Sequence, residues 1–214
     1  MSTTIAALSA APLAIGWAVH NIVWRRRIAA ARRDPLTDLP TRAVFEAQAP
    51  RLLAPGTAVL VIDLDGFKAL NDHHGHAAGD AALTTVARSL ATTATVLGGC
   101  AARLGGDEFA LALPIQHPAD LPFELAGLHE SLCEPFTFDG RRVSVGASIG
   151  AIMVGQVPVP PLERLMRRAD EAMYAAKQTG AGWFIATDAD PALPTLNGRR
   201  AGRPGTATPT GGVR

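Results

Sequence analysis

Four carboxylates stand where two apolar segments of the chain end or turn. Asp63 and Asp65 close the run TAVLVIDLD, and Asp107 and Glu108 follow two glycines inside ARLGGDEFALAL. If the two segments lie side by side, their acids meet at one edge of a sheet. Gathered carboxylates repel one another unless a cation neutralises them, and hard oxygen ligands favour Mg²⁺ or Mn²⁺. Such a site is typical of in-line phosphoryl or nucleotidyl transfer, and polar surface turns are the alternative explanation.

The residues around these acids predict the elements that hold them. The continuous apolar run over 57–65 favours a central strand buried on both faces. Apolar alternation on either side of Gly105 and Gly106 favours a hairpin, whose turn glycines tolerate a positive φ. Gly146 and Gly150 indicate bulges or close approaches in a later strand. The segment from 66 to 78 is predicted to be a polar loop.

Helical spacing and β-branched runs predict the other elements. They are a helix capped by Thr41, helices over 79–94, 122–134 and 161–180, with Gly180 as C-cap, and strands over 141–154 and 183–187. The order αβαββαβαβ predicts an α+β fold with a mainly antiparallel central sheet flanked by helices.

Composition excludes some classes of function. The 214 residues carry a formal net charge of +1 and only 5% aromatic side chains. Neither a basic field nor stacking platforms for bases are present, so no nucleic-acid partner is expected. Cys100 and Cys133 are isolated and are predicted to be buried, reduced thiols of a cytosolic domain.

The N-terminal residues predict a membrane anchor. Residues 1–24 carry no charge, and a basic segment follows over 25–33. The 20 positions from Ile5 to Trp24 match a bilayer core when helical. The basic cluster follows the span, which places the rest of the chain in the cytoplasm; a cleaved signal peptide is the alternative. Alanines at every fourth position, from Ala6 to Ala18, form a small face that either packs two such helices together or arises by chance.

The C-terminal residues predict a segment without a folded structure. Residues 188–214 are dominated by Pro, Gly, Thr and Arg, cannot bury a core, and are predicted to be a disordered tail. The folded domain is therefore predicted over 34–187.

Five segments of this domain resemble one family in the family's own order. They are DPLTDLPTR (34–42), DLDGFKALNDHHGHAAGD (63–80), RLGGDEF (103–109), SVGASIG (144–150) and ADEAMYAAKQTG (169–180). Together they closely resemble the GGDEF domain of diguanylate cyclases. The resemblance implies a palm-like fold akin to nucleotide cyclases, and the reaction 2 GTP → cyclic di-GMP + 2 pyrophosphate. It also implies a homodimer, since each domain holds one GTP. Together with the predicted anchor, it gives a single-pass protein of the bacterial inner membrane with its GGDEF domain in the cytoplasm.

The resemblance also implies roles for residues in the two acidic segments. Asp107 would bind Mg²⁺ or Mn²⁺ together with Asp63 and the backbone carbonyl of Leu64, and would help to remove the proton of the attacking 3′-hydroxyl. Glu108 would contribute to the same acidic edge. Gly105 and Gly106 would let the backbone approach the phosphates.

Four further residues would hold the nucleotide by the same resemblance. Lys68 and Lys177 would neutralise phosphate charge. Asn71 and Asp80 would select guanine, whose ring N–H and exocyclic amine an aspartate can accept together. For Asp80 a helix N-cap is the alternative role, and both can hold.

The chain departs from the family pattern in two places. Ala181 follows Gly180 where the family usually has an arginine that grips phosphate; Arg164, Arg167 and Arg168 are the candidates to replace it. VLGG (96–99) stands where many members carry the Arg-x-x-Asp of a product-inhibition site, so no such inhibition is expected. The first departure supports an alternative function, a GTP-binding regulator or adaptor without catalysis.

Overall fold

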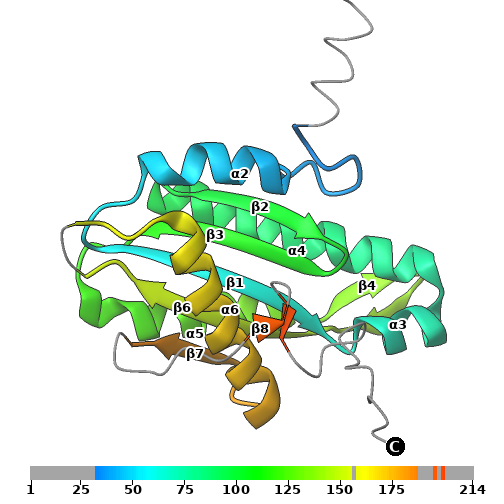
Figure 1. Ribbon diagram of the computed structural model, residues 1–214. Helices are drawn as coiled ribbons and strands as arrows, with labels where there is room; N and C mark the ends of the chain where they lie inside the picture. The colour runs from blue at the N-terminus through cyan, green and yellow to red at the C-terminus, as the bar shows by residue number, and fades with distance from the viewer. Residues whose placement is uncertain (1–31, 156–157, 188–194, 197–198, 201–214) are drawn as a thin grey trace, which may run out of the picture.

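The computed structural model describes residues 32–155, 158–187, 195–196 and 199–200. A five-stranded sheet lies between two layers of helices (Figure 1). Its strands, in the order β2-β3-β1-β6-β7, are β2 (Cys100–Gly105), β3 (Glu108–Pro114), β1 (Thr57–Asp65), β6 (Gly146–Met153) and β7 (Trp183–Ala186). The surrounding helices are α2 (Arg42–Gln48), α3 (Phe67–His74), α4 (His76–Leu97), α5 (Leu121–Cys133) and α6 (Leu162–Thr179), with short 3₁₀ turns at Ala49–Arg51 and Pro118–Asp120.

The sheet confirms the predicted α+β class. β1 lies at its centre and pairs antiparallel with β3 on one side and with β6 on the other. β2 pairs antiparallel with β3, and only β7 runs parallel to its neighbour β6. Eight of the nine residues of β1 are buried, as the continuous apolar run indicated.

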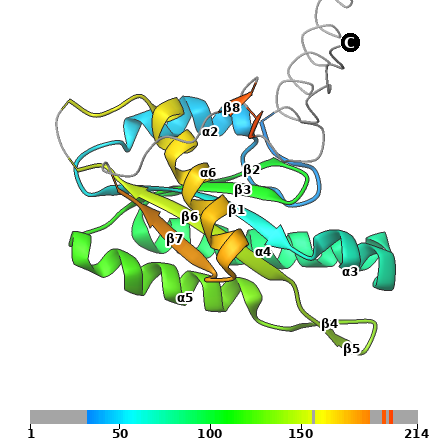
Figure 2. The ribbon, with the colours of Figure 1, turned by 60° about the horizontal axis from the view of Figure 1, so that its bottom comes forward.

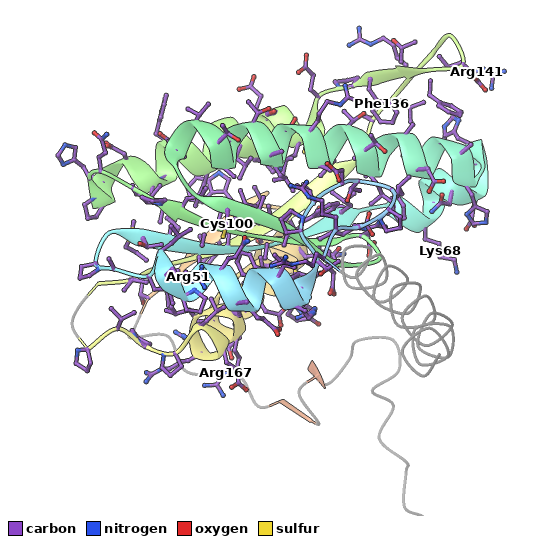
Figure 3. All side chains as sticks on the ribbon, turned by 90° about the horizontal axis from the view of Figure 1, so that it is seen from above. Arg51, Lys68, Cys100, Phe136, Arg141 and Arg167 are labelled. Carbon is purple, nitrogen blue, oxygen red and sulfur yellow. The ribbon has the colours of Figure 1, made fainter. Side chains whose placement is uncertain are left out.

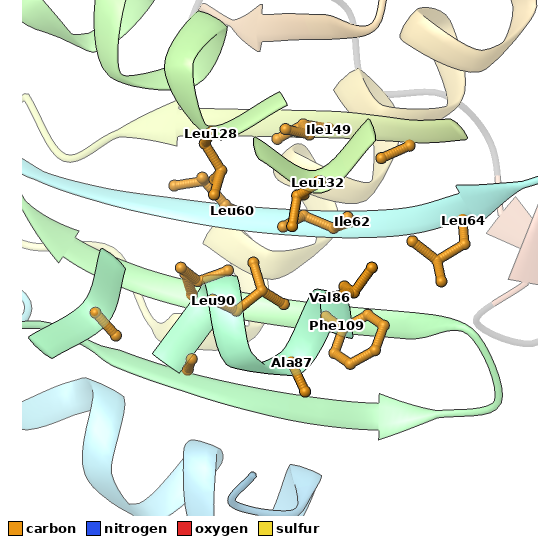
Figure 4. Close-up of a cluster of buried hydrophobic side chains, with 14 of the residues drawn as sticks. Leu60, Ile62, Leu64, Val86, Ala87, Leu90, Phe109, Leu128, Leu132 and Ile149 are labelled. Carbon is orange, nitrogen blue, oxygen red and sulfur yellow. The ribbon is translucent and has the colours of Figure 1, made fainter. Parts of the chain in front are cut away.

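Two apolar cores lie on opposite faces of this sheet. On the face covered by α4 and α5, Leu60, Ile62 and Phe109 pack against leucines of both helices (Figure 4). On the other face, Val59, Val61 and several alanines pack against α2 and α6. Because side chains alternate along a strand, the odd-numbered residues of β1 face α6 and the even-numbered ones face α4 and α5.

Gly150 lets α6 lie very close to the sheet. A Cβ built at this position would stand 2.0 Å from both the Ala169 carbonyl oxygen and the Met173 amide nitrogen. Only a hydrogen fits there, so the close approach expected at Gly150 is confirmed.

Two predicted elements are wrong. The predicted polar loop after β1 contains the helix α3, which begins after Gly66 and ends at Gly75. The predicted strand over 141–154 is broken at Ser144 and Val145. Its first part, β5 (Arg141–Val143), instead pairs with β4 (Phe136–Phe138) across the turn residues Asp139 and Gly140, and this hairpin projects beyond the main sheet (Figure 2).

The Asp139–Gly140 dipeptide explains why β5 pairs with β4. Both residues have positive φ, 46° and 73°, and Asp-Gly favours the tight turn of a two-residue hairpin.

The predicted helix caps are confirmed in part. Thr41 and Gly180 take the predicted cap positions, but Thr41 makes no side-chain hydrogen bond to its helix.

Both cysteines are free thiols, as predicted, but they are half-buried rather than buried. Burial raises the pKa of each thiol, so both stay protonated at neutral pH.

The chain ends are largely outside the described residues. Among the residues that the structure describes, no helix is long and apolar enough to cross a bilayer. The predicted anchor over 1–24 and most of the basic segment over 25–33 lie outside this part of the chain, and both stay predictions. In the C-terminal segment, β8 (Thr195–Leu196) and β9 (Arg199–Arg200) form a short antiparallel pair. The disorder predicted for the rest of that tail is likewise untested.

Candidate active site

The two acidic segments lie side by side, as expected. Asp63 on β1 and Glu108 on β3 are direct partners in the antiparallel ladder. Next to them, the Leu64 amide donates a hydrogen bond of 3.2 Å to the Asp107 carbonyl oxygen. Asp63 and Glu108 share the face of the sheet that α2 and α6 cover, since Val61 and Ala110, two residues along each strand, pack in that core.

The hairpin turn needs both of its glycines. Gly105 has φ +142° and Gly106 has φ +55°, and no atom lies within 4 Å of a Cβ built at either position. The positive φ values, rather than crowding, therefore demand glycine here. The open space above the turn is what the predicted approach of a phosphate requires.

Arg103 holds this turn from below, a role that the sequence prediction missed. Its guanidinium donates two hydrogen bonds to the Gly106 carbonyl oxygen, at 3.0 and 2.6 Å, and a third of 2.8 Å to Asp34. Asp34 also accepts hydrogen bonds from the amide and hydroxyl of Thr37. The sequence feature that could have indicated this role is the position of Arg103, a charged residue on an otherwise apolar strand.

Lys177, in the last turn of α6, reaches the acids of β1. Its ammonium donates a hydrogen bond to Asp63 and stands 3.5 Å from an oxygen of Asp65. Partial burial lowers the pKa of Lys177, but the hydrogen bond and charge of Asp63, followed by the charge of Asp65, outweigh it and leave the pKa raised. Lys177 is therefore charged at neutral pH.

Two other elements hold the acidic edge. From β6, the Ser148 hydroxyl donates a 2.8 Å hydrogen bond to Asp65. From the start of α2, the Arg42 guanidinium stands 3.9 Å from Glu108. Neither partner was predicted, because an ordinary serine and an exposed arginine carry no signal of their own in the sequence.

The two predicted guanine readers come from neighbouring helices. Asn71 lies on α3 and Asp80 on α4, where the preceding Gly79 leaves room for the Asn71 side chain. A Cβ at position 79 would stand 2.1 Å from the Asn71 Oδ1 atom. The alternative role of Asp80 as an N-cap is wrong, because α4 begins at His76, with Gly75 as its N-cap.

Lys68 lies on α3 at the edge of the molecule, where Figure 3 labels it. Its side chain is exposed, which leaves it available to an incoming phosphate. Its predicted role stays a prediction.

The three candidates to replace the missing arginine differ in their surroundings. Arg168 is buried, and its guanidinium donates to Glu171 at 2.7 Å and to the Thr187 carbonyl at 2.5 Å. These bonds make it a structural residue, so it is wrong as a candidate. Arg164 and Arg167 instead line a cavity of about 590 Å³ between α2 and α6, whose wall also contains Glu108.

The predicted metal ligands offer oxygen atoms only. In the described part of the chain, no three acidic, histidine or cysteine side chains gather closely enough to hold a metal ion. The predicted set needs fewer, since it combines the Asp63 and Asp107 carboxylates with the Leu64 carbonyl. Asp63 and Leu64 lie near the end of β1 and Asp107 lies in the turn just before β3, and this hard donor set fits Mg²⁺ with water completing its shell.

The segment at the position of the usual product-inhibition site carries no charge, and neighbouring backbone approaches it closely at Gly99. Val96 is 76% exposed at the end of α4. A Cβ at Gly99 would stand 2.3 Å from the Ala112 carbonyl oxygen, so the neighbouring backbone leaves no space for an aspartate.

Comparisons with known proteins agree with this fold. The isolated GGDEF domain of TpbB, also called YfiN, from Pseudomonas aeruginosa has a solved structure with 37% sequence identity and a TM-score of 0.65. The match covers 72% of this chain and 94% of that one. The fold is thus that of a GGDEF domain. The family model described as "Diguanylate cyclase, GGDEF domain" matches residues 31–182, and the chain belongs to this family.

Two relatives differ in how much of their length is shared. An uncharacterised 19.3 kDa protein from Streptomyces ambofaciens is 47% identical over 165 residues, which cover 76% of this chain and 87% of the relative. Diguanylate cyclase TpbB from Pseudomonas aeruginosa is 38% identical over 160 residues, which cover 71% of this chain but only 36% of TpbB.

Proposed function

We propose that the chain is a diguanylate cyclase, which joins two GTP molecules into cyclic di-GMP and releases two pyrophosphates. Family membership supports this activity. The observation that carries the proposal is the pairing of Asp63 with Glu108, together with the backbone bond from Leu64 to Asp107. This pairing brings both acidic segments and the glycine turn to one edge of the sheet, and Lys177 reaches the same edge from α6.

In the proposed reaction, the 3′-hydroxyl oxygen of each GTP bonds to the α-phosphorus of the other, and the bond to pyrophosphate breaks. Asp107 takes the hydroxyl proton. Lys68 and Lys177 contact the phosphates, and Gly105 and Gly106 let the backbone come close. A divalent cation held by Asp63, Asp107 and the Leu64 carbonyl would lower the pKa of the hydroxyl and neutralise phosphate charge.

Guanine selection belongs to Asn71 and Asp80 in this proposal. Adenine offers no pair of donors matching a carboxylate, so its binding leaves polar groups of the site unpaired. A site built on such hydrogen bonds rejects the wrong base strongly. The room that Gly79 leaves for the Asn71 side chain, beside Asp80, supports this assignment.

The proposal includes a homodimer at the membrane. Each domain supplies one GTP, and residues 1–24 anchor the chain in the bacterial inner membrane with residues 34–187 in the cytoplasm. Cross-linking the intact chain in membranes is expected to trap a dimer; a monomer contradicts this arrangement. A protein that stays in the soluble fraction after lysis contradicts the anchor.

One observation favours a second candidate function, a GTP-binding regulator without catalysis. Ala181 replaces the usual arginine, and Arg168 is engaged in structural bonds. If Arg164 and Arg167 cannot reach the phosphates, GTP binds without being converted.

The deciding experiment incubates the full-length chain with GTP and Mg²⁺ and identifies the product by mass spectrometry. Asp107→Asn removes the proposed base while keeping the shape of the side chain. Asp139→Asn is the matched control, since this residue sits at the tip of the β4–β5 hairpin with φ 46°, which asparagine adopts readily.

Cyclic di-GMP from the parent and the control, but not from Asp107→Asn, supports the cyclase. Bound GTP without product from the parent supports the regulator instead. In that case Ala181→Arg is the next variant, and its gain of activity would identify the missing arginine as the cause.

A further inference from the structure

Lys177 occupies the position where a cation is most needed. Asp63 and Asp65 are two residues apart on β1, so both side chains face α6. The Lys177 ammonium bridges them, with a hydrogen bond to Asp63 and a distance of 3.5 Å to Asp65. The same ammonium therefore forms a salt bridge with each of the two acids.

The surroundings make this neutralisation important. The Asp63 side chain is only 12% exposed, and a carboxylate so far removed from water is costly without a compensating charge. Ser148 holds one oxygen of Asp65, while the other oxygen is buried and makes no hydrogen bond. The ammonium therefore supplies a positive charge to both carboxylates.

The Lys177 side chain is also able to move away from Asp63 and Asp65. Its side chain is 43% exposed, and it stands on the last turn of α6, just before Gly180. A lysine has a flexible four-carbon stem and donates from a single charged nitrogen, so it can move between partners at low cost. The close approach of α6 at Gly150 keeps the acids within its reach.

We infer that Lys177 is an internal counter-ion that holds the place of the divalent cation at Asp63 and passes to the nucleotide phosphates when that cation binds. The inference rests on the proposed function and deepens it. An ammonium and a divalent cation at the same carboxylate compete and repel each other. The triphosphate gives the displaced ammonium a new partner. Metal alone therefore binds weakly, and metal and GTP strengthen each other's binding by the same factor.

The test measures metal binding without nucleotide. Mn²⁺ is titrated into the full-length chain, and free Mn²⁺ is read by electron paramagnetic resonance. Lys177→Met, which removes the charge but keeps the stem, is expected to bind Mn²⁺ roughly tenfold more tightly than the parent, because the competitor is gone. Lys177→Arg keeps the charge, and Lys68→Met changes the other lysine of the chain; both are expected to bind as the parent does.

An unchanged or weaker affinity of Lys177→Met for Mn²⁺ overturns the inference. A second measurement uses the parent, in case the neutral variant does not fold. Reductive ¹³C-methylation labels Lys68, Lys177 and the N-terminal amine. Saturation with Mg²⁺ is expected to shift the Lys177 resonance and leave that of Lys68 in place. A Lys177 resonance that does not move at saturation overturns the inference equally.

These readouts contain no GTP and no turnover, so they separate two kinds of failure. Tighter Mn²⁺ binding by Lys177→Met in a chain that makes no cyclic di-GMP keeps the counter-ion role and removes the cyclase. Cyclic di-GMP production by the parent, with unchanged Mn²⁺ binding by Lys177→Met, keeps the cyclase and removes the counter-ion role.

Discussion

Arg103 grips the Gly106 carbonyl oxygen through two N–H groups, at 3.0 and 2.6 Å. This forked contact ties the middle of the glycine turn to the strand beneath it. The same guanidinium bonds to Asp34, which lies near the start of the folded domain. The conformation of the turn therefore depends on a residue that is not itself a proposed metal ligand.

Arg103→Ala is expected to lower cyclase activity by about tenfold or more, because the turn loses the bonds that fix its shape. Hydrogen bonds to charged groups contribute about 1.5–3 kcal/mol each, so stability falls as well. Product formation and urea unfolding measure the two effects. Arg51→Ala, at an exposed position beyond α2, is the matched control and should change neither. Full activity in Arg103→Ala contradicts the positioning role.

The stability of the domain is expected to depend on Asp34 at acid pH. Burial raises the pKa of Asp34, but hydrogen bonds from Thr37 and Arg103 outweigh it, and the folded-state pKa lies below the usual 3.8. Its stabilising contribution is thus present above pH 3.8 and is lost as the pH falls through the folded-state pKa. The difference in unfolding free energy between the parent and Asp34→Asn should be constant from pH 5 to 7 and shrink below pH 4. A difference that grows toward low pH contradicts this assignment.

Gly79→Ala is expected to damage guanine binding without unfolding the domain. The three atoms nearest to the new Cβ all belong to the Asn71 side chain, with Oδ1 at 2.1 Å, so Asn71 must rotate while the backbone stays. The KM for GTP should rise by roughly tenfold and the preference for GTP over ATP should fall, consistent with the loss of one hydrogen-bonding partner. Steady-state kinetics with both nucleotides measure this.

The matched control for Gly79→Ala is Gly127→Ala in α5. A Cβ at position 127 meets nothing within 4 Å, so alanine there should leave the kinetics unchanged and raise stability by about 0.5–1 kcal/mol. An unaltered preference between GTP and ATP in Gly79→Ala would remove Asn71 from the guanine site.

Cyclic di-GMP is expected not to inhibit the proposed cyclase through the segment over 96–99. Val96 offers no charge there, and the backbone of Ala112 blocks a side chain at Gly99. Product is added over a wide range of concentrations during an initial-rate assay. Potent non-competitive inhibition is the result that contradicts this prediction. Val96→Arg alone should not create inhibition, since the partner acid cannot be accommodated.

The meeting of the acids could be predicted from the sequence because it follows from local patterns. The run ending at Asp63 and the alternation around Gly105 and Gly106 define two adjacent strands, and their ladder pairs Asp63 with Glu108. The contacts that complete the edge could not be predicted. Ser148 and Lys177 reach it from β6 and α6, and only the packing at Gly150 brings that helix near enough.

The errors also have physical causes. The helix α3 is short and mostly polar, and it is bounded by Gly66 and Gly75, so its composition resembles that of a loop. Its helical form comes from packing through Leu70. In the segment over 141–154, the first three residues pair with β4 through the turn at Asp139 and Gly140, and a run of β-branched residues does not show which strand is the partner.

Gly150, a buried residue outside the site, determines how closely α6 approaches the acids of the site. The distance between α6 and the sheet is set by a single missing methyl group, at a position paired with Val61 in the middle of the sheet. That distance decides whether the ammonium at the end of the helix spans the gap to the carboxylates. The contact between Lys177 and the carboxylates thus depends on the packing of the core. Any substitution that moves α6 away from the sheet weakens this contact, even when every residue of the site itself is unchanged.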